Sequence, residues 1–189
     1  MINLFSNSIG IYDNDYHSSL EEPLANQCLN IKEKYSKGGK GWLVDTYNTL
    51  NTYDLVKDKN FNILTEWIDS CVLDYCRELE YSDKINHRES WFNVYLKGDY
   101  QECHEHSNFH ISAIYCLKGD NNSAKIFFKR KSNMFLIPIK KYNSTNCEYY
   151  SVPFTAGTLY IFESSLTHYV EKHNLDKPRI SLAYNYRLQ

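Results

Sequence analysis

The sequence lacks a long apolar run, closely paired cysteines and an excess of positive charge. No stretch approaches the ~20 apolar residues that a membrane-spanning helix requires, so no membrane partner is expected. The six cysteines include no C-x-x-C pair, and the first residues carry no basic leader followed by an apolar run. We therefore expect free thiols in a reducing compartment and a cytoplasmic protein. The formal net charge of −2 gives no strong nucleic-acid signal.

Aromatic residues are abundant. They reach 15% of the chain and include 17 tyrosines and 9 phenylalanines. Tyrosine and phenylalanine favour strands, so this composition indicates a large β component. The length of 189 residues suits one domain with its own apolar core. Because the sequence also shows no internal repeat, we predict a single domain over residues 1–189.

Two helices are predicted before the strands begin. Residues Ser19–Glu22 fit a capping box at the start of the first helix, with Pro23 tolerable only in the first turn. Apolar residues then recur at helical spacing, at Leu20, Leu24, Cys28, Ile31 and Tyr35. The second helix is predicted over Phe61–Leu79, where one face is apolar and the opposite face is acidic and polar.

The sequence period changes from helical to strand-like at Trp91. Short apolar and aromatic runs follow, separated by turns that contain glycine, proline and asparagine. The predicted strands are 91–96, 109–117, 124–129, 149–152, 158–162, 168–170 and 179–186, with a further strand or arm over 4–12. We predict a mainly β (α+β) chain. Residues 86–189 form a double-stranded β-helix, or jelly-roll barrel, and the arm and two helices from 1–85 pack outside it.

His104 and His106 form a His-x-His pair where a strand meets a loop. Residues two apart in an extended strand project to the same face, so both imidazoles can point into one barrel interior. Imidazole nitrogens suit iron, zinc, copper and nickel. Taken alone the pair is a weak signal, because surface and core histidines produce it often.

The case for a metal site is strengthened by three residues that lie much later in the sequence. His168 follows the pair, and Arg179 and Ser181 lie two apart on a later strand. A metal held on one face keeps other positions open for a bidentate 2-oxo acid and dioxygen. The distant carboxylate of such an acid needs a planar guanidinium and a hydroxyl group. Arg179 and Ser181 can supply both from one face.

The order of these motifs resembles that of a known family. The segments that carry the resemblance are Trp91–Asn93, Gly98–Gln101, His104-x-His106, Ser112–Tyr115, Gly157–Phe162, Leu166-x-His168-x-Val170 and Arg179-x-Ser181. The chain resembles the iron(II)/2-oxoglutarate-dependent oxygenases of bacterial and phage type, most specifically from Trp91 to Asn185. A looser similarity covers Leu4–Phe5 and Gly41–Trp42. If the chain is phage-encoded, its expected location is the host cytoplasm.

The resemblance implies a dioxygenase that hydroxylates an unidentified primary substrate and releases succinate and carbon dioxide. Its cofactors are then iron(II), 2-oxoglutarate and dioxygen, with ascorbate as the reductant in vitro. The implied metal and catalytic residues are His104, His106 and His168. The oligomeric state is left open, with a homodimer as one form.

The same resemblance implies how the co-substrate 2-oxoglutarate is held. Arg179 and Ser181 match the clamp for its distant carboxylate. Asn93 and Tyr115 are expected as second contacts to the co-substrate. Asn185 follows on the clamp strand and is a further candidate to face the barrel interior.

The third metal ligand departs from the usual pattern of two histidines and one carboxylate. His106 occupies the carboxylate position, and a neutral imidazole leaves the site more electropositive. Glu102, on the same strand face as His104, is the alternative ligand. Three-histidine sites also bind zinc well. The rival function is therefore a cupin-like jelly roll that binds zinc or nickel and has no oxygenase activity.

Structural roles compete with each functional one. Arg179 could instead form a salt bridge to Asp176 or Glu171. His110 is expected to pack in a strand or face the substrate. His173 and His87 are expected at the surface.

Overall fold

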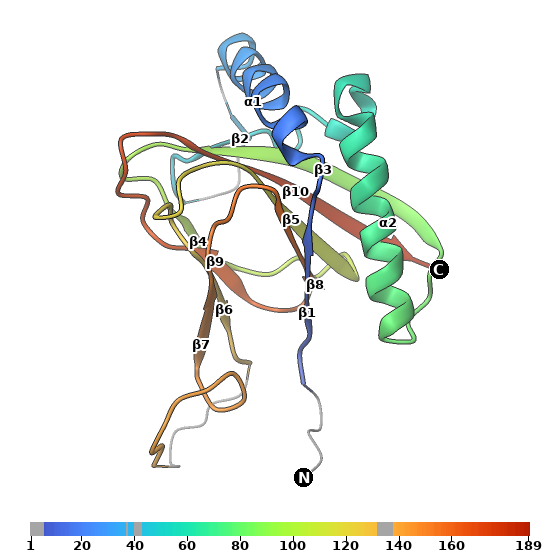
Figure 1. Cartoon of the computed structure of the whole chain (residues 1–189), viewed down its shortest axis with the longest axis vertical. Coiled ribbons are helices and arrows are strands. Elements are labelled where there is room, and N and C mark those ends of the chain that lie inside the picture. Colours follow the sequence, from blue (N-terminus) through green and yellow to red (C-terminus); the bar gives the residue numbers. More distant parts are fainter. Residues whose placement is uncertain (1–5, 37, 40–42, 132–137) are drawn as a thin grey trace.

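Two antiparallel β-sheets face each other, and two long helices lie against the outer face of the larger one (Figure 1). The computed structural model describes residues 6–36, 38–39, 43–131 and 138–189, without the side chain of His87. The helices are α1 (His17–Lys34) and α2 (Asn62–Glu78), with short 3-10 turns η1 (Leu55–Lys57) and η2 (Lys59–Phe61) between them. The looser similarity at Leu4–Phe5 and Gly41–Trp42 lies outside the described residues.

The larger sheet has six strands and the smaller has four. In spatial order the larger sheet contains β1 (Ile9–Asp13), β8 (Thr158–Glu163), β5 (Ile111–Lys118), β10 (Arg179–Leu188), β3 (Ile85–Tyr95) and β2 (Tyr47–Asn48). The smaller contains β4 (Gln101–His104), β9 (His168–Val170), β6 (Ile126–Lys129) and β7 (Tyr149–Val152). The described strands do not close into one continuous barrel, because each sheet keeps two unpaired edges.

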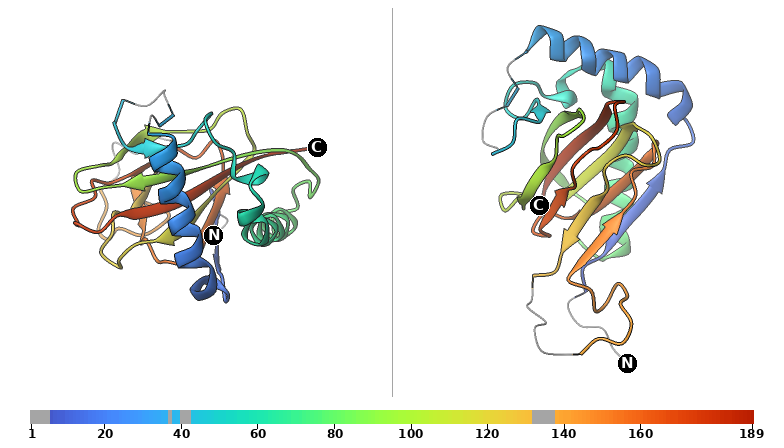
Figure 2. Two further views of the ribbon diagram at one scale, coloured as in Figure 1. Left: turned by 90° about the horizontal axis from the view of Figure 1, so that it is seen from above. Right: turned by 90° about the vertical axis from the view of Figure 1, so that its left-hand side faces the viewer.

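Alternation along β10 separates two apolar cores. Ile180, Leu182 and Tyr184 point toward the helices, in a core shared with buried residues of α1 and α2 such as Ile68. Side chains of both sheets form a second core between them, including Tyr95, Phe128 and Phe162. The helices cover one face and the smaller sheet covers the other (Figure 2), so β10 is buried on both faces.

The prediction of a mainly β chain with two helices ahead of most strands is confirmed. The second helix was predicted over 61–79 and spans 62–78. The capping box at Ser19–Glu22 is wrong, because α1 begins at His17 and the Ser19 hydroxyl donates to the Tyr16 carbonyl at 2.7 Å. Pro23 lies inside α1 beyond its first turn. A helix that packs an apolar face against a sheet can tolerate the lost backbone hydrogen bond.

Most predicted strands are present, and two were missed. The strands over 149–152 and 168–170 have the predicted bounds. Strand β2 has only two residues. Strand β4 was missed because its sequence, Gln-Glu-Cys-His, has no alternating apolar residues. Its inward positions carry polar side chains instead, and strand patterns in sequence depend on apolar ones.

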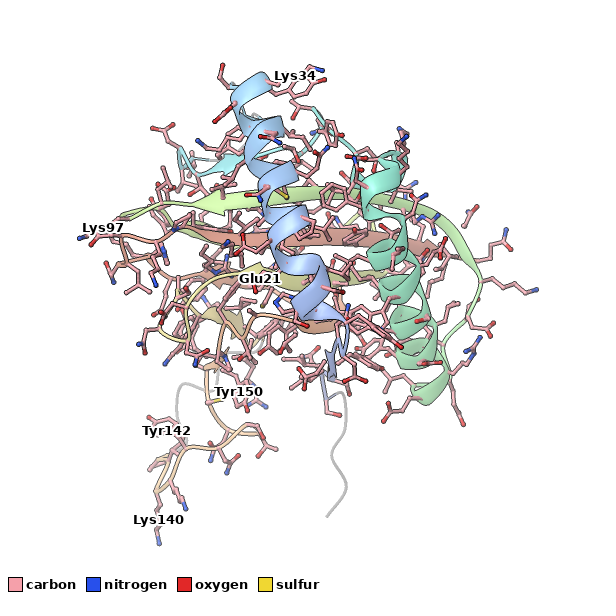
Figure 3. All side chains as sticks on the ribbon, turned by 45° about the horizontal axis from the view of Figure 1, so that its top comes forward. Glu21, Lys34, Lys97, Lys140, Tyr142 and Tyr150 are labelled. Carbon is pink, nitrogen blue, oxygen red and sulfur yellow. The ribbon has the colours of Figure 1, made fainter. Side chains whose placement is uncertain are left out.

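The described residues 138–148, which lead into β7, extend away from both sheets (Figure 3). Tyr142, in the far part of this segment, is 70% exposed, and Tyr150, where the chain returns to β7, is 47% exposed. These side chains therefore add little to either core. None of the helices in the described ranges is long and apolar enough to cross a bilayer.

We predict that docking of α2 on the sheet can be tested with two isoleucines of the same helix. Ile68 is fully buried, so Ile68→Ala should lower the free energy of unfolding by about 2–5 kcal/mol. Ile63 is 71% exposed, and Ile63→Ala should change it by less than about 0.5 kcal/mol. Urea unfolding followed by circular dichroism measures both. Equal losses from the two variants would contradict the described packing of α2.

Candidate metal centre

Three imidazoles converge between the two sheets. His104 ends β4, His168 begins β9, and the two are direct cross-strand partners. Their ring centroids lie 4.3 Å apart, and the His106 centroid lies 5.0 Å and 5.2 Å from those of His104 and His168. One nitrogen of each ring lies within 4.8 Å of the other two, so the three could hold a metal ion.

His106 reaches this cluster by a turn and not along a strand. Strand β4 ends at His104, so the two histidines do not share an extended segment as the sequence predicted. The His106 backbone N–H donates to the Ser164 carbonyl at 2.9 Å, and its carbonyl accepts from Phe109 at 3.0 Å. These backbone bonds fix the turn that brings the third ring inward.

Burial keeps the three rings neutral. Desolvation lowers the pKa of His104 and of His168, the latter well below its ordinary value. Desolvation together with the nearby His104 lowers the pKa of His106 to about 3. A neutral imidazole has a lone pair to give to a metal, whereas a protonated one has none.

The ring proton of two histidines is held by backbone carbonyls. The Nδ1 atom of His104 lies 2.7 Å from the Glu102 carbonyl oxygen, and that of His168 lies 2.9 Å from the Leu166 oxygen. A carbonyl oxygen only accepts, so each Nδ1 carries the hydrogen and each Nε2 carries a lone pair. This tautomer allows each ring to ligate a metal through Nε2.

Glu102 is not part of the cluster. Its two carboxylate oxygens accept from the Leu43 backbone N–H at 2.8 Å and from the Gln101 side chain at 3.1 Å. The groups that can converge on one ion in the described part of the chain are the three imidazoles alone. The alternative of a Glu102 ligand therefore has no support in this geometry.

Arg179 lies in the same pocket and is fully buried. Its guanidinium carbon sits 4.5 Å from the centroid of the Tyr95 ring and 4.3 Å from that of Phe154. Its Nε donates to the Ala124 carbonyl at 3.2 Å and its Nη1 to the Ser181 hydroxyl at 3.3 Å. The remaining nitrogen, Nη2, is buried and has no hydrogen-bond partner.

No carboxylate among the described residues forms an ion pair with Arg179. Asp176 pairs with Lys97 at 2.9 Å, and Glu171 accepts from the Lys125 backbone N–H at 2.9 Å. The structural alternative for Arg179 is therefore absent in the described chain. Desolvation lowers the pKa of Arg179. A buried charge that has no partner of opposite charge costs several kcal/mol. An anion bound in the pocket would offset that cost.

The pocket joins the histidines to the arginine. It is lined by Trp91, Asn93, Tyr95, Gln101, His104, His106, Ser112, Ala113, Ile114, Phe162, His168, Val170, Arg179, Ser181, Ala183 and Asn185. Six of the seven predicted site residues are brought together here. Tyr95 and Gln101 were missed, although Tyr95 lies two residues beyond Asn93 and so shares its strand face.

Tyr115 is the predicted site residue that the structure does not bring to the pocket. It belongs to the core against the helices, and its hydroxyl lies 2.9 Å from Nδ1 of His17. Its neighbours Ser112 and Ile114 line the pocket through the other face of β5. The predicted contact between Tyr115 and the co-substrate is therefore wrong, because Tyr115 lies on the face of β5 that is turned toward the helices.

Two further histidines differ from their predicted environments. His173 was expected at the surface but is fully buried, with Nε2 donating to the Lys177 carbonyl at 2.8 Å. His110 was expected to pack in a strand or face substrate. It is exposed just before β5 and accepts from the Leu188 backbone N–H at 3.0 Å.

A family model described as "Putative 2OG-Fe(II) oxygenase" matches residues 89–185, which is just over half of the chain. The chain belongs to this 2OG-Fe(II) oxygenase family. No protein in the curated set matches. As a family member, the chain is expected to use iron(II) and 2-oxoglutarate, and the three-histidine cluster and Arg179 lie within the matched range.

Solved structures share the fold of this oxygenase at low sequence identity. A prolyl-4-hydroxylase from Pseudomonas putida aligns with a TM-score of 0.68 at 14% identity, covering 97% of this chain and 94% of that one. A prolyl hydroxylase from Trichoplax adhaerens, in complex with a hypoxia inducible factor peptide fragment, gives 0.69 at 14%, covering 96% and 84%. HygX from Streptomyces hygroscopicus with iron bound gives 0.64 at 11%, covering 97% and 83%.

The lowered pKa values of the three histidines predict that the metal-free oxygenase loses stability in mild acid. Below the ordinary histidine pKa of 6.5 the unfolded chain binds protons that the folded chain excludes, down to about 3 at His106. The free energy of unfolding should fall by up to about 1.4 kcal/mol per pH unit for each ring. Urea unfolding at a series of pH values between about 7.5 and 5 measures the slope.

His106→Gln should make that slope shallower, because the variant lacks one of the rings that bind a proton in the unfolded chain but not in the folded chain. His110→Gln is the matched control, since His110 is exposed, and it should leave the slope as in the wild type. Identical slopes for all three proteins would show that His106 is not kept neutral by the fold.

Proposed function

We propose that this chain is an iron(II)- and 2-oxoglutarate-dependent dioxygenase that hydroxylates an as yet unidentified substrate on a double-stranded β-helix scaffold. The observation that carries the proposal is the unpartnered Nη2 of Arg179, buried in the same pocket as three convergent neutral imidazoles. One end of the pocket is suited to a cation and the other to an anion. A dicarboxylate that chelates a metal satisfies both ends with one molecule.

The donor set fits iron(II). His104, His106 and His168 would hold the ion through one nitrogen each, leaving other positions for the co-substrate and dioxygen. Because all three ligands are neutral, the charge of the ion must be balanced by what binds beside it. A dianionic 2-oxo acid supplies that balance, which supports co-substrate binding after the metal.

The anion end fits the distant carboxylate of 2-oxoglutarate. Arg179 would donate through Nη2, the nitrogen that has no protein partner, and Ser181 would donate through its hydroxyl. Asn93 is the cross-strand partner of Ser181 and lines the pocket, so it is proposed as a second contact. The Tyr95 and Phe154 rings lie 4.5 Å and 4.3 Å from the guanidinium carbon and help to fix its orientation by cation–π contact.

The residues around the metal exclude water and orient the ligands. Phe162 packs edge-on against the His168 ring, with centroids 4.8 Å apart, and Trp91 lies 5.6 Å from His106. When bound, iron(II) and 2-oxoglutarate would activate dioxygen, which is the oxidant: one of its oxygen atoms would enter the substrate C–H bond and the other the succinate formed as 2-oxoglutarate loses carbon dioxide. Two solved structures of the same fold are described as prolyl hydroxylases, which supports hydroxylation as the reaction.

Arg179→Ala should weaken 2-oxoglutarate binding by about 100-fold or more while metal binding is retained. The variant removes a desolvated, charge-assisted contact at one end of the pocket and leaves the imidazoles in place. Calorimetric titration of 2-oxoglutarate into the manganese(II)-loaded protein without oxygen measures the change. Arg187→Ala is the matched control, because Arg187 lies on the same strand and is exposed. Unchanged affinity in Arg179→Ala would refute the clamp.

His168→Ala should lower metal affinity by more than about 100-fold and abolish slow succinate formation in the presence of iron(II), ascorbate and 2-oxoglutarate. The change leaves two imidazoles where three are needed. The exposed His110 provides the control His110→Ala, which should behave as the wild type. Wild-type protein that retains zinc and binds no 2-oxoglutarate would instead favour the metal-binding jelly roll without oxygenase activity.

A further inference from the structure

The third imidazole is held by a different device from the other two. Nδ1 of His104 and of His168 each meets the backbone carbonyl two residues earlier. Nδ1 of His106 meets a side chain instead, and lies 3.3 Å from Nδ2 of Asn185. Backbone carbonyls cannot reverse polarity, but an amide side chain presents a donor at one end and an acceptor at the other.

Asn185 belongs to a closed network of buried groups. Its Oδ1 lies 2.7 Å from the Ser112 hydroxyl, which lies 2.8 Å from the Ser164 hydroxyl. The Ser164 carbonyl accepts from the backbone N–H of His106, which closes the network. Asn185 and Ser112 are direct cross-strand partners on β10 and β5. Each of the three side chains is at most 2% exposed, so water does not compete for these bonds.

The direction of this network decides whether His106 can bind a metal. With the Asn185 amide nitrogen facing the ring, Nδ1 accepts, the ring proton lies on Nε2, and that nitrogen has no lone pair for an ion. With the amide turned by 180°, Oδ1 accepts from Nδ1–H and Nε2 is free. The amide nitrogen then donates to Ser112, whose hydroxyl donates to Ser164, so every contact keeps a partner.

We propose that Asn185, supported by Ser112 and Ser164, is a positioning residue that selects the metal-binding tautomer of His106. This inference rests on the proposed metal site and assigns a role there to Asn185, which is not itself a metal ligand. Ion binding requires the amide oxygen to face the ring, and the two serine hydroxyls allow this because each can either donate or accept. The third ligand is thereby set by side chains, whereas the first two are set by backbone.

The test compares two substitutions at Asn185 by titration with cobalt(II), read from the visible absorption of the bound ion. Asn185→Ala removes the acceptor and should lower cobalt(II) affinity by about 10- to 100-fold. Asn185→Asp keeps an acceptor toward Nδ1–H and toward Ser112, and should hold affinity within about threefold of the wild type or raise it. Asn14→Ala is the matched control, because Asn14 is also buried and does not line the pocket.

A second readout reports the tautomer itself. Long-range ¹⁵N–¹H spectra of the zinc-loaded wild type should show the hydrogen on Nδ1 of all three ligand histidines. In zinc-loaded Asn185→Ala a fraction of the His106 signal should show the hydrogen on Nε2, in molecules where this ring has left the ion, while the signals of the other two ligands stay unchanged. Circular dichroism confirms that each variant is folded. Ser112→Ala is a milder change that keeps the proposal testable if Asn185→Ala does not fold, and it should lower cobalt(II) affinity below that of the wild type.

The outcomes separate this inference from the proposed oxygenase. Wild-type cobalt(II) affinity in both Asn185→Ala and Ser112→Ala, or an equal loss in Asn185→Ala and Asn185→Asp, overturns the positioning role while leaving the oxygenase intact. The expected order of affinities together with no binding of 2-oxoglutarate supports the positioning role and overturns the oxygenase. Wild-type protein that binds no cobalt(II) overturns both.

Discussion

The burial of β10 on both faces is the constraint on which the rest of the structure depends. One face of this strand must be apolar, because α1 and α2 pack against it, and Ile180 and Leu182 meet that need. The other face looks into the pocket between the sheets and carries Arg179, Ser181 and Asn185. One strand thus supplies both a core and a site, and a shift of its register by one residue would exchange them.

Exclusion of water has opposite effects at the two ends of the pocket. At the histidines it favours the neutral ring and so preserves three lone pairs. At Arg179 it leaves a charged group with an unpartnered nitrogen, which favours an anion. Both groups line one buried pocket, but each has its own apolar neighbours: Phe162 packs on His168, and Tyr95 and Phe154 lie against Arg179. Burial therefore matters as much as the choice of residues in making one end of the pocket suited to a metal ion and the other end suited to a carboxylate.

The amino-acid sequence predicted the elements with strong periodicity and the order of the functional residues. The α2 helix and the strands at 149–152 and 168–170 were predictable because their apolar patterns are regular. Strand β4 was not, because its inward side chains are polar. The histidine pair could be found by spacing alone, yet the turn that brings His106 inward depends on a backbone bond to Ser164, far along the chain.

Which face of a strand looks inward could not be derived from the sequence of β5. Residues 111–118 are mostly buried on both sides, so the pattern gives no preferred parity. The family resemblance assigned Tyr115 to the pocket, and the strand pattern could not correct this; Tyr115 faces the helices. The partners of Arg179 illustrate the same limit. Tyr95 follows from strand parity, whereas Phe154 comes from a loop whose path only the folded chain defines.

The cross-strand pairing of His104 with His168 has a mechanical consequence for the smaller sheet. Strands β4 and β9 have only four and three residues, so few backbone bonds hold them together. An ion shared by the two rings would act as a cross-link between points 64 positions apart in the sequence. Because the ion would bind the folded chain and not the unfolded one, it would also stabilise the pairing of these two short strands.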